Sequence, residues 1–434
     1  MTRTAPAPRE SVVREPDAAR CAAVAREHFA RRDARELWGT GLSAWRDSMR
    51  TALGLPTDRP IVMTGHQAGI WHAGIAEKFL LGEEVARAIG GALVHVVVDH
   101  DANDAGIVAF PAIVDDGRGS RVLARLALER SPRSPSVNAL RRPVRTMRPE
   151  RPHEVPAAIE PALARIEAAI ASEFRRENLA MQMAHAANRL LVPHARVEHT
   201  VAASAFAQLS LAQAMRDEFA SMRAAYNAAV AHERIALLAA QELPFWRLDA
   251  ASGSRIPLLE HSPQGMLAPR ALSLTAIARL ALCDLFIHGT GGARYDRAME
   301  RWIGESCGDA VRAALAPMAM ATATRLAPIA EFVPPFDRAA TPEALRALEQ
   351  DPFGDAPGPT AAGATKRALL ANITGPKASR RAAYVAMRRE IESARNGHAA
   401  EIAALRARVD ANREASRAAT LAADRTWPFP MTVD

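Results

Sequence analysis

The chain has 434 residues, 49% of them hydrophobic and 24% charged, with a formal net charge of +7. That length exceeds one ordinary domain, so we expect either several folding units or one large domain with insertions. The polar start over 1–16 does not resemble a secretory signal, and no apolar run reaches the roughly 18 residues that a membrane span needs. Three scattered cysteines exclude a disulfide framework and a thiolate metal site, so we expect a cytoplasmic protein.

The basic residues are unusual in kind. They are spread along the chain without a lysine-rich tail or interleaved aromatic residues, so we expect anionic small molecules rather than nucleic acid as partners. Among the 55 basic residues only Lys78, Lys366 and Lys377 are lysines. Because the two side chains are not interchangeable, a lysine kept in such a chain points to a need for a compact ammonium or an adjustable pKa.

The first third of the chain predicts a βαβ unit preceded by a helix. A loose apolar face over 17–52 indicates the helix, and the apolar run 61–63 indicates a short strand. A helix over 73–89 and a β-branched strand over 92–98 complete the unit, with a third strand over 107–114. Strand, glycine turn, helix and strand in close succession predict a parallel, right-handed sheet.

The rest of the chain is expected to be mainly helical. Its elements are a linker or exposed loop over 129–156, helices over 157–191, 205–242 and 272–282, a hairpin over 243–259, a loop over 338–375 and one long charged helix over 377–423. The resulting segments are 1–130 (N-terminal helix and first part of the core), 131–192 (linker and helical insertion), 193–337 (second part of the core), 338–376 (loop-rich) and 377–434 (long helix and docking tail).

The long C-terminal helix carries a thin apolar stripe. Ile391, Ile402, Leu405 and Val409 form this stripe, which suits a coiled coil or a helical hairpin and a homodimer through the helix. The end of the chain, 425–430, is too aromatic for a free tail, so we expect it to dock on the body.

A glycine-rich turn separates the first strand of the βαβ unit from its helix. Such a turn lies at the carboxyl edge of an open sheet, where helix N-terminal amides face a bound anion. Two histidines in the turn would reach the same phosphate or carboxylate. The alternative is a turn with one capping and one surface histidine. The candidate residues are Thr64, Gly65, His66, Gln67, Gly69 and His72.

Lys78 lies on the helix that follows this turn, six residues beyond His72. The ordinary reading is a solvated helix lysine. The scarcity of lysine in this chain favours instead a contact with a bound phosphate.

A second polar group directly follows the buried strand over 92–98. Carboxylates and an imidazole crowded at the carboxyl end of a central strand are costly unless they bind something. They would position an amine, hold Mg²⁺ or act as a general base, and the alternative is a structural loop with Asx turns. The spacing is wrong for the usual zinc motifs. The candidates are Asp99, His100, Asp101 and Asn103, with Asp104 beside them.

A third group begins at Asp284 and opens from an apolar segment into glycines. It would cradle a phosphate or wall the pocket, or it is a simple glycine loop. Its candidate residues are His288, Gly289, Gly291, Gly292, Tyr295 and Asp296, with Arg294 beside them. Farther on, Lys377–Arg381 resembles the KMSKS loop of class I aminoacyl-tRNA synthetases, although a helix start explains it more simply.

The first two groups together resemble the bacillithiol-synthesis cysteine-adding enzymes. That family carries a Thr-Gly-Gln-Gln-Ala-Gly turn and, after the next strand, a Glu-Asp-His-Asp run. The matching residues are Thr64, Gly65, Gln67, Ala68, Gly69, Asp99, His100 and Asp101, and Gly291, Gly292 and Tyr295 correspond to a late glycine-rich segment with a tyrosine. The resemblance covers 55–115 well and 195–300 loosely. His66 replaces a glutamine of the family, His72 has no clear equivalent, and the register of Lys78 differs, so the chain is a divergent relative.

The resemblance implies a Rossmann-like parallel sheet of the class I synthetase type, with helical insertions and a C-terminal coiled coil. It implies a ligase that joins an amino acid, cysteine being one candidate, to an amine with ATP or a related nucleotide, Mg²⁺ being a candidate companion. His66, His72 and Lys78 would stabilise phosphate charge, the Asp99–Asp101 run would deprotonate the amine, and His288, Tyr295 and Asp296 would close the pocket. The alternative is a non-catalytic ligand-binding or scaffold protein whose coiled coil binds partners.

Overall fold

The computed structural model describes residues 10–31, 33, 35–117, 120–129, 136–149, 152–262, 265–353 and 363–432. The chain forms two compact units. Unit 1 comprises Met1–Ala112, Arg125–Pro328 and Asp424–Asp434, and unit 2 comprises Ile113–Ala124 and Ile329–Ala423. The fold is mixed α/β, as predicted.

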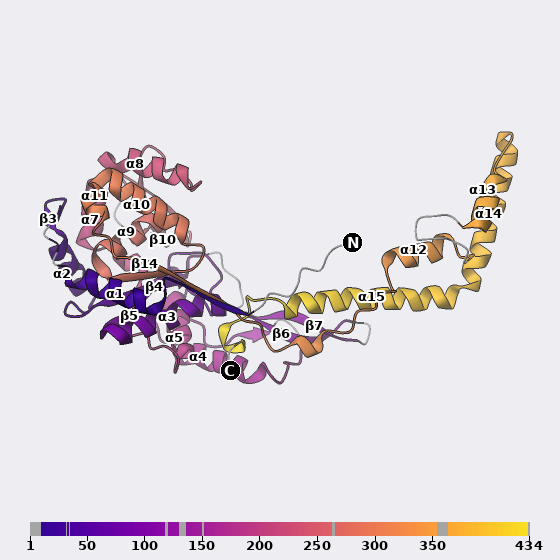
Figure 1. The fold of residues 1–434 in the computed structure, drawn as a ribbon, viewed down its shortest axis with the longest axis horizontal. Helices are drawn as coiled ribbons and strands as arrows, with labels where there is room; N and C mark the ends of the chain where they lie inside the picture. Colours follow the sequence, from indigo (N-terminus) through magenta and orange to yellow (C-terminus); the bar gives the residue numbers. More distant parts are fainter. Residues whose placement is uncertain are drawn as a thin grey trace. The chain divides into compact units, whose positions relative to one another are not determined.

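A six-stranded sheet forms the core of unit 1, in the order β1-β14-β13-β4-β5-β9. Figure 1 labels β4, β5 and β14 of this sheet. The strands are β1 (Ser11–Glu15), β4 (Ile61–Gln67), β5 (Ala92–Val98), β9 (His199–Ala202), β13 (Leu285–His288) and β14 (Met318–Thr324). Neighbours are parallel except for β1, which pairs antiparallel with β14. The predicted parallel β4–α3–β5 unit is confirmed, with α3 spanning Ala73–Ile89 and capped by the left-handed Gly90.

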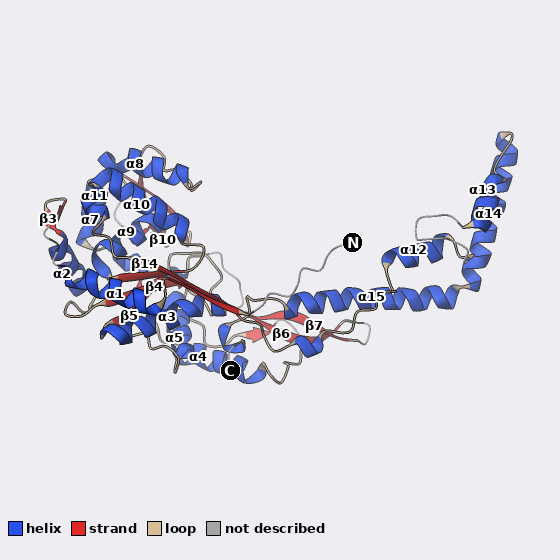
Figure 2. Ribbon diagram, in the orientation of Figure 1, coloured by secondary structure: helices blue, strands red, loops and turns tan. Residues whose placement is uncertain are grey.

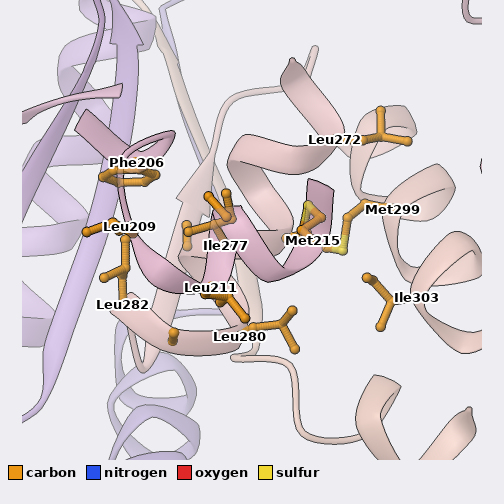
Figure 3. Packing of buried hydrophobic residues seen from close by; sticks show 14 of the residues in the cluster. Phe206, Leu209, Leu211, Met215, Leu272, Ile277, Leu280, Leu282, Met299 and Ile303 are labelled. Carbon is orange, nitrogen blue, oxygen red and sulfur yellow. The ribbon is translucent and has the colours of Figure 1, made fainter. Parts of the chain in front are cut away.

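Helices lie around the strands of unit 1, as Figure 2 shows in blue and red. Their buried side chains pack against the sheet in two separate apolar clusters. Alternate strand residues point to opposite faces. Val62 and Leu93 therefore join one cluster with α3 and with α1 (Ala18–Ala30), whereas Met63 and Val94 join the other. The second cluster is the larger, and Figure 3 shows Met215 and Met299 meeting within it.

The predicted helix over 17–52 is wrong as a single element. It consists of α1 and α2 (Leu42–Ala52), separated by the short hairpin β2 (Glu36–Leu37) and β3 (Thr40–Gly41). Trp38 and Gly39 between these strands both have positive φ, 54° and 74°. A two-residue hairpin turn requires that conformation, and a helix cannot pass through it.

The third predicted strand exists but belongs to another sheet. β6 (Ile107–Asp115), β7 (Arg121–Glu129) and β8 (Arg148–Pro149) form a three-stranded sheet of their own. The predicted linker over 129–156 is likewise not simply exposed, because Val137, Asn138 and Arg141 are buried. Residues 130–135 and 150–151 of that segment lie outside the described residues.

The remaining helices of unit 1 are α4 (Glu160–Ser172), α5 (Leu179–Leu191), α6 (Ala203–Phe206), α7 (Ser210–Asp217), α8 (Phe219–His232), α9 (Ala271–Ile277), a π-helical turn over Ala278–Leu282, α10 (Ala293–Cys307) and α11 (Asp309–Arg312). The long helices expected over 157–191 and 205–242 are thus broken into shorter ones. The hairpin predicted around Gly253 is confirmed as β10 (Glu242–Asp249) and β11 (Ser254–Leu259), with β12 (Leu267–Pro269) on its other side.

Unit 2 is largely helical. The expected loop over 338–375 contains α12 (Pro342–Gln350) and α13 (Ala364–Ala371), while 354–362 lie outside the described residues. The single helix expected over 377–423 is two helices, α14 (Lys377–Gly397) and α15 (Ala399–Ala422), which are separated at His398 and run in different directions (Figure 1). In the described parts of the chain, no helix is both long and apolar enough to cross a membrane.

A buried carboxylate joins several elements of unit 1 at the amino end of the sheet. Asp284 directly precedes β13 and accepts hydrogen bonds from Arg50 of α2 at 2.8 Å and from the amide of Ile61 at 2.8 Å. Nδ1 of His28 in α1 lies 3.0 Å from it. Burial alone would raise the pKa of Asp284, but the hydrogen bond with His28 and the charge of Arg50 lower it below its usual value.

We expect Asp284→Ala to lower the free energy of unfolding by about 3–5 kcal/mol, because it leaves the buried guanidinium of Arg50 without its counter-charge. The contribution of Asp284 is present above the ordinary aspartate pKa and is lost as the pH falls through its lower folded value, so the variant should also show a weaker acid dependence. Urea unfolding at several pH values measures both effects. Asp309→Ala, at an exposed ion pair, is the control and should change stability little.

Candidate functional site

Three strand ends meet at the carboxyl edge of the sheet. β4 runs four residues farther than the apolar run suggested and ends at Gln67, which lies opposite Val98 at the end of β5. Gln67 donates a hydrogen bond to Asp101, and Asn103 donates one to the carbonyl of Ala68 at 2.8 Å. The prediction that the first two polar groups share one edge is therefore confirmed.

Thr64 and Gly65 serve the packing of the sheet. The hydroxyl of Thr64 is buried and donates to the carbonyl of Ile287 in β13 at 2.8 Å. A Cβ atom at Gly65 would lie 2.6 Å from the carbonyl oxygen of Val96, so only glycine lets β5 approach β4 at this point. These packing contacts account for the residue types at positions 64 and 65, and neither residue needs a ligand to explain it.

Lys78 is buried at this edge. Its side chain is 3% exposed, and its Nζ donates to the carbonyl oxygen of Gly65 at 2.6 Å. The side chain of Lys78 also lies close to Gly289 in the loop after β13, because a Cβ atom added to Gly289 would be 3.8 Å from Cδ of Lys78. Within the described ranges it forms no ion pair, and burial lowers the pKa of its ammonium to about 7. The solvated helix lysine is thereby excluded.

The two histidines of the turn have different environments. His66 is partly buried, and burial together with the charge of Lys78 lowers its pKa to about 3, so the imidazole is neutral at pH 7. His72 is the N-cap of α3, because its Nδ1 accepts a hydrogen bond from the amide of Gly74 at 3.1 Å. The capping role considered for one histidine thus belongs to His72. Gly69 has a positive φ of 150° in the turn between them.

The C-terminal tail docks beside this turn, as predicted. Pro428 forms a β-bridge with His72, and the amide of Phe429 donates to the carbonyl of Trp71 at 2.7 Å. Trp427 is fully buried, with the guanidinium of Arg125 over its ring at 4.6 Å from the centroid. The tail therefore covers the start of α3.

The carboxylates after β5 are engaged by the protein itself. Asp99 accepts hydrogen bonds from the amide of Ser204 at 3.0 Å and from its hydroxyl at 2.5 Å. Asp101 is paired with Arg255. His100 is buried, and its Nδ1 lies 3.6 Å from Asp99, too far for a hydrogen bond. Both aspartates of the run therefore have partners, whereas Nδ1 of His100 has no hydrogen-bond partner in the described part of the chain.

Two residues of the presumed linker fix this loop, and the sequence did not identify them. Asn138 is fully buried, and its amide donates to the carbonyls of Asp101 at 3.1 Å and Asn103 at 2.8 Å. Arg141 donates from both terminal nitrogens to Asp104 at 3.0 Å. The only local signal was an asparagine followed by an apolar residue inside a Pro- and Arg-rich stretch, which is too weak to identify a partner.

The third group divides between the two ends of β13. Asp284 lies at the amino end, in the network described above. His288 ends the strand, and its Nε2 lies 2.9 Å from Oδ2 of the buried Asp296 without the geometry of a hydrogen bond. The other oxygen of Asp296, Oδ1, accepts a hydrogen bond from Arg279 at 3.2 Å. A Cβ atom at Gly292 would overlap the imidazole, so glycine is needed for this position of the His288 ring.

The other members of the third group are more accessible. Tyr295 is partly buried against the larger apolar cluster, and its hydroxyl accepts from Arg294 at 3.2 Å. Gly289 and Gly291 continue the loop after the strand, and Gly291 has open space around its Cα. We call Gly65, His66, Lys78, Asp101 and His288 the carboxyl-edge cluster.

Two cavities in the described part of unit 1 lie elsewhere. One of about 90 Å³ is lined by Ala76, Glu77 and Leu80 of α3 together with Phe429 of the tail. The other, of about 310 Å³, lies beside α4 at Arg145 and Glu167. None of the predicted catalytic or binding residues lines either cavity. Among the described residues, no group of three or more metal-ligating side chains is arranged to hold an ion.

Comparisons with known proteins give no family for the chain. No family model matches the sequence, and no curated protein matches it. The resemblance to the cysteine-adding enzymes therefore stays a prediction from the motifs.

The burial of Lys78 makes a prediction about stability. Its folded pKa is about 7 and its ordinary value 10.5, so between these pH values the unfolded chain binds one more proton than the folded chain. The free energy of unfolding should therefore rise with pH in this window, by at most about 1.4 kcal/mol per pH unit from this group. Lys78→Met should remove this increase and leave stability at pH 7 equal or higher, because it buries a methyl thioether in place of an amine.

Urea unfolding of the parent and of Lys78→Met at pH 7, 8 and 9 measures this difference in slope. Lys377→Met, at an exposed lysine, is the control and should keep the slope of the parent. Equal slopes in all three proteins would show that Lys78 is not a buried amine.

Proposed function

We propose that unit 1 binds an anionic small molecule, a nucleotide or its phosphate, at the carboxyl-edge cluster, and that the protein is a ligase-like enzyme joining an amino acid to an amine. The single observation that carries the binding site is Lys78: a buried amine with a pKa of about 7 and one hydrogen bond to a backbone carbonyl. A cation placed in this way costs free energy unless an anion supplies its partner.

The surroundings of Lys78 support an anion. The ammonium lies at the end of β4, where it donates to the carbonyl of Gly65, and the loop after β13 brings Gly289 close to the side chain of Lys78. His66 is neutral at physiological pH, so it would donate a hydrogen bond to a phosphate oxygen without adding a charge. The carboxyl edge of a parallel sheet is where such ligands bind in open α/β folds.

The chemistry of the ligase rests on fewer groups. His100 is the candidate base for the attacking amine, because its Nδ1 is not hydrogen-bonded and Asp99 lies beside it. Asp99, Asp101 and Asp104 accept hydrogen bonds from Ser204, Gln67 and Arg141, so they do not fit an ion held by protein side chains alone. Mg²⁺, if used, would therefore arrive with the nucleotide, whose chemistry is the activation of a carboxyl group.

The finer predictions belong to the same proposal. They are a Rossmann-like relationship to class I synthetases, a cytoplasmic location and a homodimer through α14 and α15. The competing function is a non-catalytic ligand-binding protein. Turnover of ATP in the presence of amino acids and amines separates the two, since a binding protein releases no product.

Binding should depend on pH through Lys78. An anion favours the charged ammonium, so affinity should fall as the pH rises above about 7, by up to roughly tenfold per unit. Sulfate is a suitable probe because its charge is constant over this range, and His66 stays neutral throughout. Calorimetric titration with sulfate and with ATP at pH 6, 7 and 8 measures the effect.

Lys78→Met should abolish this pH dependence and weaken binding by more than about 1 kcal/mol, the scale of one charge-assisted contact. Lys366→Met is the control and should bind like the parent, because Lys366 donates to the carbonyl of Gln350 and belongs to neither proposed binding surface. A Lys78→Met protein that keeps the parent affinity and loses stability would show that Lys78 serves only to hold the backbone of Gly65 through its hydrogen bond. The proposed site would then be wrong.

A further inference from the structure

The net charge of the chain is concentrated in one part of unit 2. Residues 363–397 contain eight basic and two acidic residues, so they account for +6 of the net +7. These residues form α13 and α14. The expectation that the positive charge is spread evenly along the chain is therefore wrong for its net charge.

Most of the basic residues of α14 have no partner in the protein. Five of them are exposed and take part in no ion pair or hydrogen bond with the described residues. They are Lys377, Arg380, Arg381, Arg388 and Arg389. Arg395 is the exception, since it donates to the carbonyl of Glu349.

The neighbouring helix α15 is different, although it is also exposed and rich in arginine. Arg406 pairs with Glu349 at 2.5 Å, Arg408 with Asp337 at 2.5 Å, Arg413 with Asp410 at 2.6 Å and Arg417 with Glu414 at 2.5 Å. Within the same unit, one helix therefore neutralises its arginines and the other does not. The composition of the chain alone does not explain this contrast.

The unpaired cations of α14 share one side of the helix with an aromatic ring. Four of the cations lie three, four or seven residues from Tyr384 in the sequence, and these helical spacings place them along one face. They are Lys377, Arg380 and Arg381 before Tyr384, and Arg388 after it. Tyr384 is 50% exposed in the middle of this row. At about 1.5 Å per residue the row extends roughly 16 Å, comparable to several successive phosphates of a nucleic-acid strand.

We propose that this face of α14 binds the phosphate backbone of a nucleic acid. Guanidinium groups pair with phosphates through parallel hydrogen bonds, and an exposed tyrosine between them offers a stacking surface for a base. A membrane surface fits less well, because a helix that lies in a bilayer needs a free apolar face. The apolar residues Met387 and Ile391 of α14 are already buried within the protein, which leaves Val385 and Tyr384 as its exposed large hydrophobic residues, too few for a continuous apolar face.

The test uses the full chain and two matched variants. Arg380→Gln/Arg381→Gln/Arg388→Gln removes three unpaired cations, and Arg406→Gln/Arg413→Gln/Arg417→Gln removes three paired ones from α15. Fluorescence anisotropy measures binding to single-stranded RNA, duplex RNA and duplex DNA over a range of salt concentrations. Circular dichroism checks that each variant is folded. If either triple variant is not folded, the single variant Arg388→Gln in α14 is compared with the single variant Arg413→Gln in α15.

The parent should bind at least one of the three nucleic acids with a strong salt dependence. The α14 variant should lose roughly tenfold or more in affinity, with the slope against salt on duplex DNA smaller by about two to three, since each lost phosphate contact removes about 0.9. The α15 variant should bind within about threefold of the parent, because its cations are already paired. A larger loss on single strands than on duplexes for Tyr384→Ala would identify stacking.

Three outcomes would overturn the proposal. Equal losses in both variants would mean that net charge alone drives binding. Failure of the parent to bind any of the nucleic acids at low salt would exclude this partner. Binding through α14 to vesicles containing phosphatidylserine, without binding to nucleic acid, would assign the face to a membrane surface instead.

Discussion

The buried carboxylate of Asp284 is the interaction on which the core of unit 1 depends. It joins the start of β13 to the start of β4 through the amide of Ile61, and it joins the sheet to α1 and α2 through His28 and Arg50. A buried anion is tolerated only when such partners surround it, so these elements must assemble together. Because β13 spans only Leu285–His288, this structural end and the polar carboxyl end are one short strand apart.

The opposite edge has the reverse electrostatic character. There the protein buries a cation, Lys78, and gives it a single backbone carbonyl. Asp101, which accepts a hydrogen bond from Gln67 at this edge, is already paired with Arg255. At the amino end, the buried carboxylate of Asp284 has the guanidinium groups of Arg50 at 2.8 Å and Arg46 at 3.7 Å as partners. At the carboxyl end, Lys78 has no carboxylate partner among the described residues. This asymmetry is the physical argument for placing a ligand at the carboxyl edge rather than elsewhere on the sheet.

The local part of this arrangement could be predicted from the sequence. The β4–α3–β5 unit follows from apolar periodicity and a glycine cap, which are signals confined to neighbouring residues. The breaks in longer elements could not be predicted in the same way: Trp38 adopts a positive φ that its residue type disfavours, and His398 interrupts an otherwise uniform helical pattern. Nor could the contacts that fix the Asp99–Asp104 loop be predicted, because Asn138, Arg141 and Ser204 reach it from 35 or more residues away.

The protein leaves cations without acidic partners in two environments, and the two have different energetic consequences. At Lys78 burial removes water from the amine and so lowers its pKa, and no carboxylate of the described residues offsets this cost. On α14 the cations remain hydrated and cost little. A buried unpaired cation therefore favours a small anion that can enter a confined edge and displace little solvent. A row of hydrated cations along a helix favours an extended anion that contacts several of them at once, since each exposed contact is weak by itself and only their sum gives useful affinity.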